Sequence, residues 1–230
     1  MSSRGSIDSL VAFTALVAIG CGGGGKDAAC PTVPTAAASA SSGSGADSGA
    51  PLAQPSIVSG SPGNELLDPN PAPATIVVKL TTDGGRVPLQ SVFNGFGCTG
   101  KNVSLGISWS GAPASTQSYA VILHDPDAPT GVGFFHWSVF NLPKGTTSLA
   151  PGASTGGLPA GAGQGYTDFG VSGYGGPCPP PGAPHRYIAT VYALDVPKLD
   201  VGPGATGALL RFMLAQHTTA LGRATATYGR

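Results

Sequence analysis

The sequence contains few charged residues and, from Thr75 onward, no glutamate. Lys, Arg, Asp and Glu make up 10% of the 230 residues, with 11 of each sign and a formal net charge of zero. There is therefore no basic tract that would attract nucleic acid, and no acidic tail. The 37 Gly and 22 Pro argue against a helix bundle and indicate many turns and loops.

A common metallohydrolase pattern is also missing, because the chain has no His-Glu-x-x-His. Asp125, Asp127, His136 and His185 are nevertheless metal-compatible side chains, so a metal-dependent hydrolase that uses this cluster stays open as an alternative. Since the domain has no Glu to act as a general base, we expect a binding protein rather than an enzyme.

The N-terminus has the pattern of an export signal. Leu10–Ile19 is an apolar run, too short to cross a bilayer but long enough for the core of a secretory signal. It ends in Ala18-Ile19-Gly20-Cys21, which resembles a bacterial lipobox except that Ala18 replaces the usual Leu. We predict a signal peptide over residues 1–21, lipidation of Cys21, and a membrane-anchored lipoprotein facing the periplasm or cell surface. An ordinary signal peptide with an incidental Cys21 is the alternative.

Residues 22–74 consist mainly of Gly, Ala, Ser, Thr and Pro. Such a segment buries too little apolar surface to offset its ordering entropy, and we predict a disordered tether. The folded domain then spans residues 75–230, a size typical of one domain. Within it, nine Lys and Arg face six Asp, a net charge of +3 that is compatible with an anionic ligand.

The domain has the pattern of a mainly β, largely antiparallel fold with one or two short C-terminal helices. Alternating or short apolar runs bounded by Gly and Pro indicate the strands. The predicted strands are Thr75–Thr82, Val103–Trp109, Tyr119–Leu123, Phe134–Asn141, His185–Leu194 and an edge strand over Thr218–Tyr228.

One helix is predicted between Thr206 and Gln216. Thr206 is expected to be its N-cap, because it follows Pro203-Gly204 and precedes an apolar run. Arg211 is expected on the outer face. The predicted apolar face consists of Leu209, Leu210, Phe212, Met213 and Leu214.

Asp125-Pro126-Asp127-Ala128-Pro129 lies between two of the predicted strands. Each Pro fixes its own φ and keeps the preceding residue out of the helical region, so both carboxylates are held on a stiff backbone. His136 lies near the start of the return strand, where it could face the carboxylates across the hairpin. Two carboxylates and an imidazole at the rim of an apolar sheet indicate a site for a small ligand.

Several motifs in one order resemble the phosphatidylethanolamine-binding protein family, and most of all its bacterial, Raf-kinase-inhibitor-like branch. The resemblance extends from about Val78 to Arg230 and departs from the usual pattern at Leu105, where Pro is expected. It implies an antiparallel β-sandwich with a small anion pocket at one end. The motifs are Gly97–Ser104, Asp125–Pro129, His136-Trp137, Asn141–Pro143, Tyr174–Pro180, His185–Tyr187 and Ala193–Asp195.

The resemblance also implies which residues form that pocket and what it holds. Family members bind phosphate-like headgroups, nucleotides or acetate there, and several regulate kinases or proteases by docking. No cofactor is implied, and we expect a small phosphate-like or carboxylate ligand, with a protein partner left open. The implied lining is Asp125, Asp127, His136, His185 and Tyr187, with Gly176 and Pro177 in the wall.

An anion beside two carboxylates needs compensation. Either a carboxyl group stays protonated or the imidazoles carry charge, supported by the Tyr187 hydroxyl and backbone N–H groups. We expect Asp125 to order the wall through backbone N–H groups while His136 and His185 contact the ligand. The hypothesis that follows is tighter binding below about pH 6.5, where an unperturbed imidazole becomes charged.

The remaining polar and sulfur side chains have simpler interpretations. His124 and His217 are expected to be structural, while Arg186 is either a surface charge or an anion clamp. Cys98 and Cys178 lie in segments that carry the resemblance, and an exported protein could bridge them beside the pocket. Sequence separation cannot decide whether their Cα atoms come within bridging range.

Overall fold

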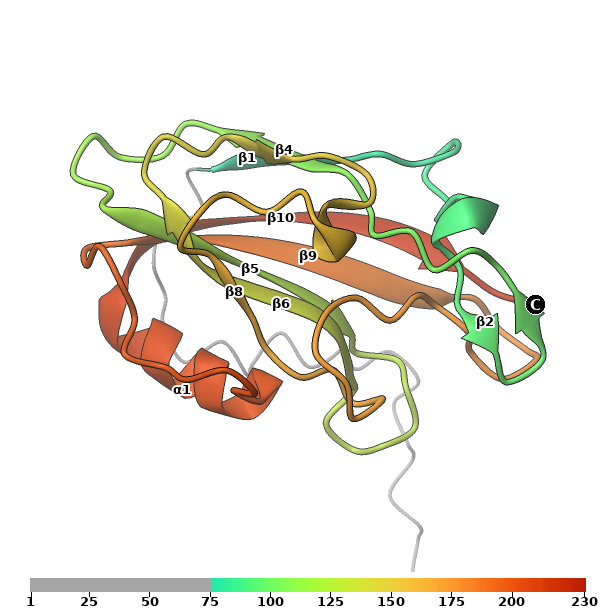
Figure 1. Cartoon of the computed structure of the whole chain (residues 1–230). Helices are drawn as coiled ribbons and strands as arrows, with labels where there is room; N and C mark the ends of the chain where they lie inside the picture. Colours follow the sequence, from blue (N-terminus) through green and yellow to red (C-terminus); the bar gives the residue numbers. More distant parts are fainter. Residues whose placement is uncertain (1–75) are drawn as a thin grey trace, which may run out of the picture. The chain divides into compact units, whose positions relative to one another are not determined.

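The computed structural model describes residues 76–230 (Figure 1). The predicted signal peptide, the lipidation of Cys21 and the predicted tether lie outside the described residues. In the described part, a five-stranded sheet has the order β10-β9-β5-β6-β8, a three-stranded sheet the order β1-β4-β7, and β2 and β3 form a small ribbon. All paired strands are antiparallel.

Two 3-10 turns, η2 and η3, interrupt the loops between strands. The bounds of the strands, turns and helix are β1 Val77–Leu80, η2 Leu89–Ser91, β2 Asn94–Gly95, β3 Cys98–Thr99, β4 Ile107–Ser110, β5 Ser118–Asp125, β6 Phe134–Pro143, β7 Ser148–Leu149, η3 Ala153–Thr155, β8 Gly163–Gln164, β9 His185–Leu194, α1 Gly207–His217 and β10 Thr218–Tyr228.

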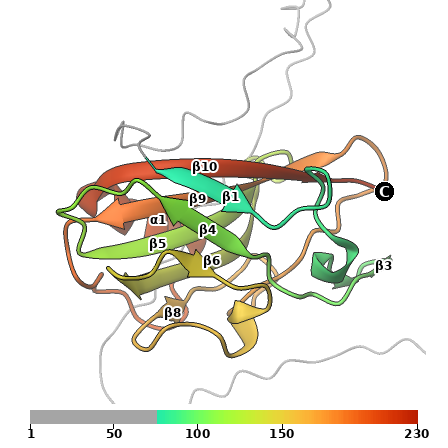
Figure 2. The same ribbon diagram turned by 90° about the horizontal axis from the view of Figure 1, so that it is seen from above.

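The five-stranded sheet is covered on both faces. The small sheet lies above it and α1 below it in Figure 1, and the view from above shows β1 and β4 crossing over the longer strands (Figure 2). One apolar core lies between the sheets and a second lies beneath α1. The predicted antiparallel β-sandwich is thus confirmed, with one helix in the described part of the chain.

Strand β5 shows how one sequence serves both cores. All eight of its residues are buried, because both faces of a central strand are covered. Tyr119, Val121 and Leu123 belong to the core between the sheets, whereas Ala120 and Ile122 belong to the core beneath α1. Strand β9 alternates in the same way. The alternation therefore determines on which face of the sheet the polar residues at the ends of these strands lie.

Strand β6 departs from this alternation at two β-bulges. Near its start, His124 pairs with Phe135 and Leu123 pairs with Trp137, so His136 is an extra residue. Phe135 packs beneath α1 while Trp137 lies in the core between the sheets, although strict alternation would place both on one face. The second bulge occurs at Asn141, whose φ is 58°.

Helix α1 confirms part of its prediction. The Thr206 hydroxyl accepts a hydrogen bond from the Leu209 N–H at 3.2 Å, as an N-cap does. The predicted apolar face is wrong in two positions, because only Leu210 and Leu214 are fully buried while Leu209 and Phe212 are exposed. Arg211 is not on the outer face either: its guanidinium lies over the Phe135 ring, 4.9 Å from the ring centre.

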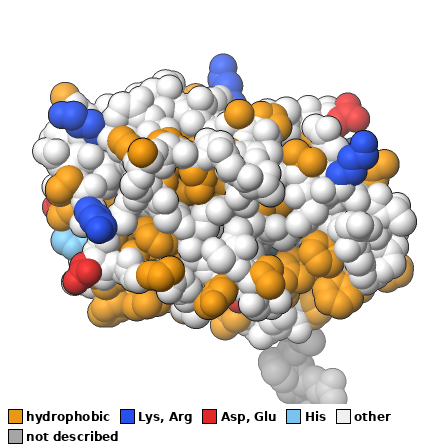
Figure 3. Space-filling view, in the orientation of Figure 1, with side chains coloured by type: hydrophobic (Ala, Val, Ile, Leu, Met, Phe, Trp, Pro, Cys, Tyr) orange, Lys and Arg blue, Asp and Glu red, His pale blue; other side chains and the backbone are white. Residues whose placement is uncertain are grey.

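Figure 3 shows apolar side chains gathered over α1 at the lower left, and few charges on this face. The buried face of α1 is narrower than the sequence predicted, because an 11-residue helix that packs against a sheet on one side buries a single stripe of side chains.

The predicted strand over Val103–Trp109 begins later than expected. Strand β4 starts at Ile107, because the Val103 N–H donates to the Gln90 carbonyl at 2.9 Å and the preceding residues pack along the η2 turn instead of a sheet. His217 pairs with Asp195 at 3.1 Å, as expected for a structural histidine at a helix end.

Candidate ligand-binding site

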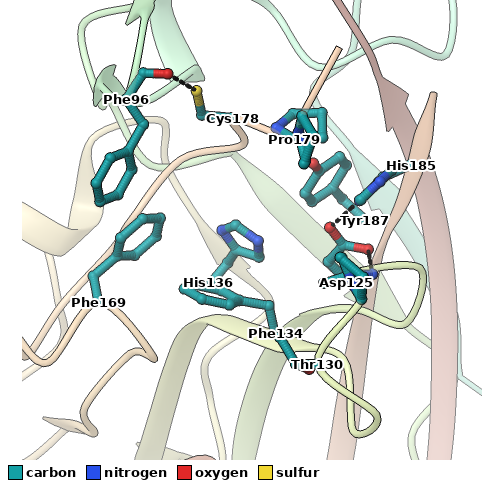
Figure 4. Close-up of a pocket in the computed structure, with 13 residues that line it drawn as sticks. Phe96, Asp125, Thr130, Phe134, His136, Phe169, Cys178, Pro179, His185 and Tyr187 are labelled. Atoms are coloured by element: carbon teal, nitrogen blue, oxygen red, sulfur yellow. Dashed lines mark hydrogen bonds and ion pairs between the residues drawn. The ribbon is translucent and has the colours of Figure 1, made fainter. Parts of the chain in front are cut away.

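A pocket opens at the end of the sandwich where β5 ends and β9 begins. Its cavity volume is about 180 Å³. Figure 4 shows Phe96 and Phe169 on one side, Asp125 and His185 on the other, and His136 between them. We call this cavity the Asp125 pocket; it is lined by Phe96, Asp125, Ala128, Pro129, Thr130, Phe134, His136, Phe169, Cys178, Pro179, Pro180, His185 and Tyr187.

Asp125 is the last residue of β5 and is 3% exposed. Its Oδ1 accepts hydrogen bonds from the backbone N–H groups of Asp127, at 2.8 Å, and Ala128, at 3.1 Å. Its Oδ2 lies 2.7 Å from Nδ1 of His185. The carboxylate therefore shapes the turn, as expected from the sequence, and it also orients an imidazole, which the sequence did not predict.

His136 reaches the pocket because it is the extra residue of a bulge. Its Nδ1 lies 2.6 Å from the Gly175 carbonyl oxygen, which can only accept, so Nδ1 carries the proton and Nε2 is left for a ligand. The side chain is 4% exposed. Burial lowers the pKa of His136 below 6.5, opposed in part by the Gly175 carbonyl and the charges of Asp125 and Asp168.

Tyr187 comes from the neighbouring strand. The register of β9, which pairs Ile188 with His124, places Tyr187 opposite Asp125 on the inner face of the sheet. The residue is fully buried, and its hydroxyl has no hydrogen-bond partner among residues 76–230. Burial, the negative charge of Asp125 and a contact with its carboxylate that does not meet hydrogen-bond geometry raise the pKa of Tyr187, so the group stays a neutral donor. An unpaired buried hydroxyl beside a cavity is costly unless something else bonds to it.

Asp127 does not line the Asp125 pocket, contrary to the sequence prediction. Its Oδ2 accepts from the backbone N–H of Arg186 at 2.8 Å and from Nε at 2.9 Å, and its Oδ1 accepts from a terminal guanidinium nitrogen at 2.7 Å. Arg186 lies between His185 and Tyr187 on β9, so its side chain points to the opposite face and holds Asp127 there. Hydrogen bonds and charge from Arg186 hold the pKa of Asp127 below 3.8.

Gly176 and Pro177 do not line the pocket either; they lie behind its wall. The Gly176 N–H donates to the Asn102 Oδ1 at 2.7 Å, and a Cβ at Gly176 would collide with the Ser91 carbonyl. The Pro177 carbonyl accepts from the Phe93 N–H at 3.0 Å. The two residues anchor the wall, whose inner surface is made by the residues that follow them.

Long-range ties hold that wall in place. Cys98 and Cys178 form a disulfide with Cα atoms 6.0 Å apart, which decides the open question of their pairing. The Arg230 Nε donates to the Pro179 carbonyl at 2.8 Å. Asn102 adds a second bond, from its Nδ2 to the Tyr174 carbonyl at 3.0 Å. The wall has almost no regular secondary structure and is fixed by these contacts.

The aromatic side of the pocket was missed in the sequence. Phe96, Phe134 and Phe169 lie on three separate segments and line the cavity together. The Phe134 and Phe169 rings meet edge to face at 4.8 Å, and Phe169 stacks on Phe93 at 4.4 Å. The local sequence around a single Phe in a Gly-rich loop does not distinguish a ring that lines a pocket from a ring on the surface. These three residues could therefore be identified only from the fold.

The family model for phosphatidylethanolamine-binding protein matches residues 79–229. The chain belongs to this family. The matched segment contains every residue of the Asp125 pocket.

Relatives in the family cover the same domain. YbhB of Escherichia coli is 46% identical over 148 residues, which is 64% of this chain and 94% of YbhB. The crystal structure of E. coli YbcL, described as a new member of the mammalian PEBP family, superposes with a TM-score of 0.65 at 42% identity, covering 68% of this chain and 99% of that one. LppC of Mycobacterium tuberculosis, named as a candidate lipoprotein, is 36% identical over 71% of this chain and 77% of its own length.

Residues 76–230 contain no group of three or more His, Cys, Asp or Glu side chains arranged to hold a metal ion. Asp125 and His185 contact one another, and His136 is committed through Nδ1 to a carbonyl. In the same described part, no helix has both the length and the apolarity needed to cross a membrane.

Proposed function

We propose that this member of the phosphatidylethanolamine-binding protein family binds a small anion, a phosphate-like or carboxylate headgroup, in the Asp125 pocket. The observation that carries the proposal is the buried Tyr187 hydroxyl, which has no hydrogen-bond partner among residues 76–230 and lies beside the cavity. His136 adds a ring nitrogen, Nε2, from the neighbouring strand, which accepts from a protonated ligand or, once it carries a proton, donates to an anion. The proposed role is binding without catalysis, with regulation of a partner protein through the occupied pocket as its further part.

The pocket can accept an anion despite Asp125. The carboxylate accepts hydrogen bonds from two backbone N–H groups and faces His185, so part of its charge is offset before a ligand enters. The Tyr187 hydroxyl donates to the ligand, and a proton on His185 or on the ligand itself would balance the second negative charge.

Calorimetry on the full-length chain with inorganic phosphate, phosphoethanolamine and acetate tests the proposal. We expect measurable binding of at least one of these anions and a loss of roughly tenfold or more in His136→Ala, about the value of a hydrogen bond to a charged group. His217→Ala is the matched control, because His217 pairs with Asp195 away from the pocket. Failure of all three anions to bind the unmodified chain would reject the proposed function.

The affinity should depend on pH, with a lower midpoint than the sequence suggested. His136 is surrounded by Asp125 on β5, Tyr187 on β9 and Asp168 in the loop that follows β8, and burial lowers its pKa below 6.5. Protonation of His136 in the ligand-free protein therefore requires more acid than protonation of a free imidazole does. We expect affinity to rise as pH falls below 6.5; flat affinity between about pH 5 and 8 would contradict this.

We further propose that the chain is exported and anchored through lipid on Cys21. The lipobox-like ending at Cys21 and the similarity to LppC, named as a candidate lipoprotein, support this. Radiolabelled palmitate should be incorporated into the wild-type chain and not into Cys21→Ala. Labelling of the variant, or none in the wild type, would contradict the anchor.

The hydrolase alternative receives no support from the pocket geometry. Among residues 76–230, no three His, Cys, Asp or Glu side chains are grouped to hold a metal ion, and the Thr130 hydroxyl of the lining donates to the Gly133 carbonyl. We therefore propose binding without catalysis. Turnover of p-nitrophenyl phosphate or acetate that is lost in His185→Ala would overturn that statement.

A further inference from the structure

The Asp125 pocket has a polar side and an apolar side, and the apolar side is incompletely covered. The Phe96 and Phe169 rings lie 6.1 Å apart and both border the cavity. Phe96 is nevertheless 73% exposed. A large aromatic ring that faces solvent at the edge of a cavity gains little from the fold itself, and it gains more when a ligand covers it.

The backbone holds Phe96 at this edge. Its φ is 51°, a left-handed conformation that is uncommon for a bulky residue. The ring stacks on Phe93 at 5.6 Å, and the disulfide at Cys98 fixes the hairpin two residues later. Strained residues of this kind are found at ligand clamps more often than elsewhere. The backbone conformation, the stacking on Phe93 and the disulfide therefore hold Phe96 at the mouth of the cavity.

The charges of the lining limit the ligand. No Lys or Arg is among the residues that line the Asp125 pocket in the described part of the chain. Asp125 already uses His185 as its partner. Since a charge removed from water needs a partner, this cavity suits a group with one negative charge better than a phosphate monoester, which carries between one and two at neutral pH.

The cavity size limits it further. A volume of about 180 Å³ lies below the roughly 300–1,000 Å³ of pockets that hold drug-sized ligands. A bare inorganic ion would contact the polar side alone and leave the rings wet. A ligand with an acid group and a short apolar part would contact both sides.

We propose that the Asp125 pocket takes a small apolar carboxylic acid, with its acid group at Tyr187, His136 and His185, one proton being shared between the acid and an imidazole, and its hydrocarbon part against Phe96 and Phe169. This inference rests on the proposed function, because it names the class of anion. Phe96 is then the residue that determines specificity for the apolar part.

A series of acids with constant charge and increasing length tests the inference. Calorimetry on the full-length chain at about pH 5.5, where that proton is more readily available, would compare acetate, butanoate, hexanoate and inorganic phosphate. We expect affinity to rise at each step, with hexanoate about tenfold or more tighter than acetate, as burial of methylene groups predicts. Inorganic phosphate should bind more weakly than hexanoate.

Variants of Phe96 separate the two sides of the pocket. Phe96→Ala should weaken hexanoate about fivefold and leave acetate within about twofold, while Phe96→Leu should retain most of the hexanoate affinity. Leu89→Ala is the matched control, since Leu89 is 65% exposed and lies outside the lining. Circular dichroism of each variant verifies that the fold is retained.

The outcomes distinguish this inference from the proposed function. If acetate or phosphate binds but affinity does not rise with chain length, or if phosphate binds more tightly than hexanoate, the inference is overturned and anion binding stands. If Phe96→Ala weakens acetate as much as hexanoate, Phe96 does not contact the apolar part. If none of the four probes binds, the proposed function fails and the inference fails with it.

Discussion

The two sides of the Asp125 pocket are built in different ways. The polar side is carried by strands: Asp125 ends β5, His136 lies in the bulge of β6, and Tyr187 lies on β9. The aromatic and proline side is carried by loops that the Cys98–Cys178 disulfide and a few side-chain hydrogen bonds hold in place. Strand register therefore determines the chemistry of the site, and long-range cross-links determine its shape.

Removal of the disulfide should have the largest effect, and it should fall on the loop side. Cys98→Ser with Cys178→Ser opens a covalent link between residues 80 apart in sequence, which is expected to cost about 4 kcal/mol of unfolding free energy. Denaturant unfolding measures the cost. Hydrogen exchange should show faster exchange of the Gly176 N–H, while the Asp127 N–H stays protected.

Wild-type protein treated with reductant provides a second route to the same state if the double variant folds poorly. Equal loss of protection on both sides of the pocket would show that they are not built independently.

Asp125→Ala should have the next largest effect, on the strand side. The substitution leaves two backbone N–H groups and the His185 ring without their acceptor, at a cost of about 3 kcal/mol. Anion binding should be lost as well, because His185 is no longer oriented. Urea unfolding and calorimetry measure the two effects, with Asp200→Ala, an exposed acid, as control. A variant that binds with unchanged affinity would show that Asp125 is not needed for the site.

Arg186→Ala should have the smallest effect, because it breaks an ion pair outside the pocket. The Arg186 side chain is 42% exposed and that of Asp127 is 29% exposed, so the pair should contribute about 0.5–1 kcal/mol. The lowered pKa of Asp127 sets the pH dependence: its contribution is present above pH 3.8 and is lost as pH falls through the lower folded pKa.

Urea unfolding of wild type and Arg186→Ala should therefore differ at pH 7 and converge below pH 3.8. Anion affinity should be unchanged in this variant. A loss of affinity as large as that expected for His136→Ala would show that Asp127 and Arg186 contribute to ligand binding after all.

The sequence predicted the strand side better than the loop side. Alternation in β5 and β9 is regular, so the faces of Asp125, His185 and Tyr187 follow from it. The position of Asp127 does not follow, since its partner Arg186 is 59 residues away and only the register of β9 brings them together. The rings of the loop side are separated by long irregular segments, and no local propensity determines where such segments cross.

His136 shows a different limit of the sequence. Its place at the pocket was predicted, but the orientation of its side chain could not be. A bulge exists only in the pairing of two strands, so one strand's sequence cannot reveal it. Strict alternation would have assigned Phe135 and Trp137 to one core.

The bulge at His136 also makes the site depend on the length of a strand. Because His136 is an additional residue, exchanging its side chain leaves the division of Phe135 and Trp137 between the two cores intact. Deleting the residue would instead force one of those rings onto the wrong face. The side chain at position 136 can therefore change without disturbing the fold, whereas the residue itself cannot be deleted. We expect relatives to differ in ligand through substitutions at this position and to lack one-residue deletions there.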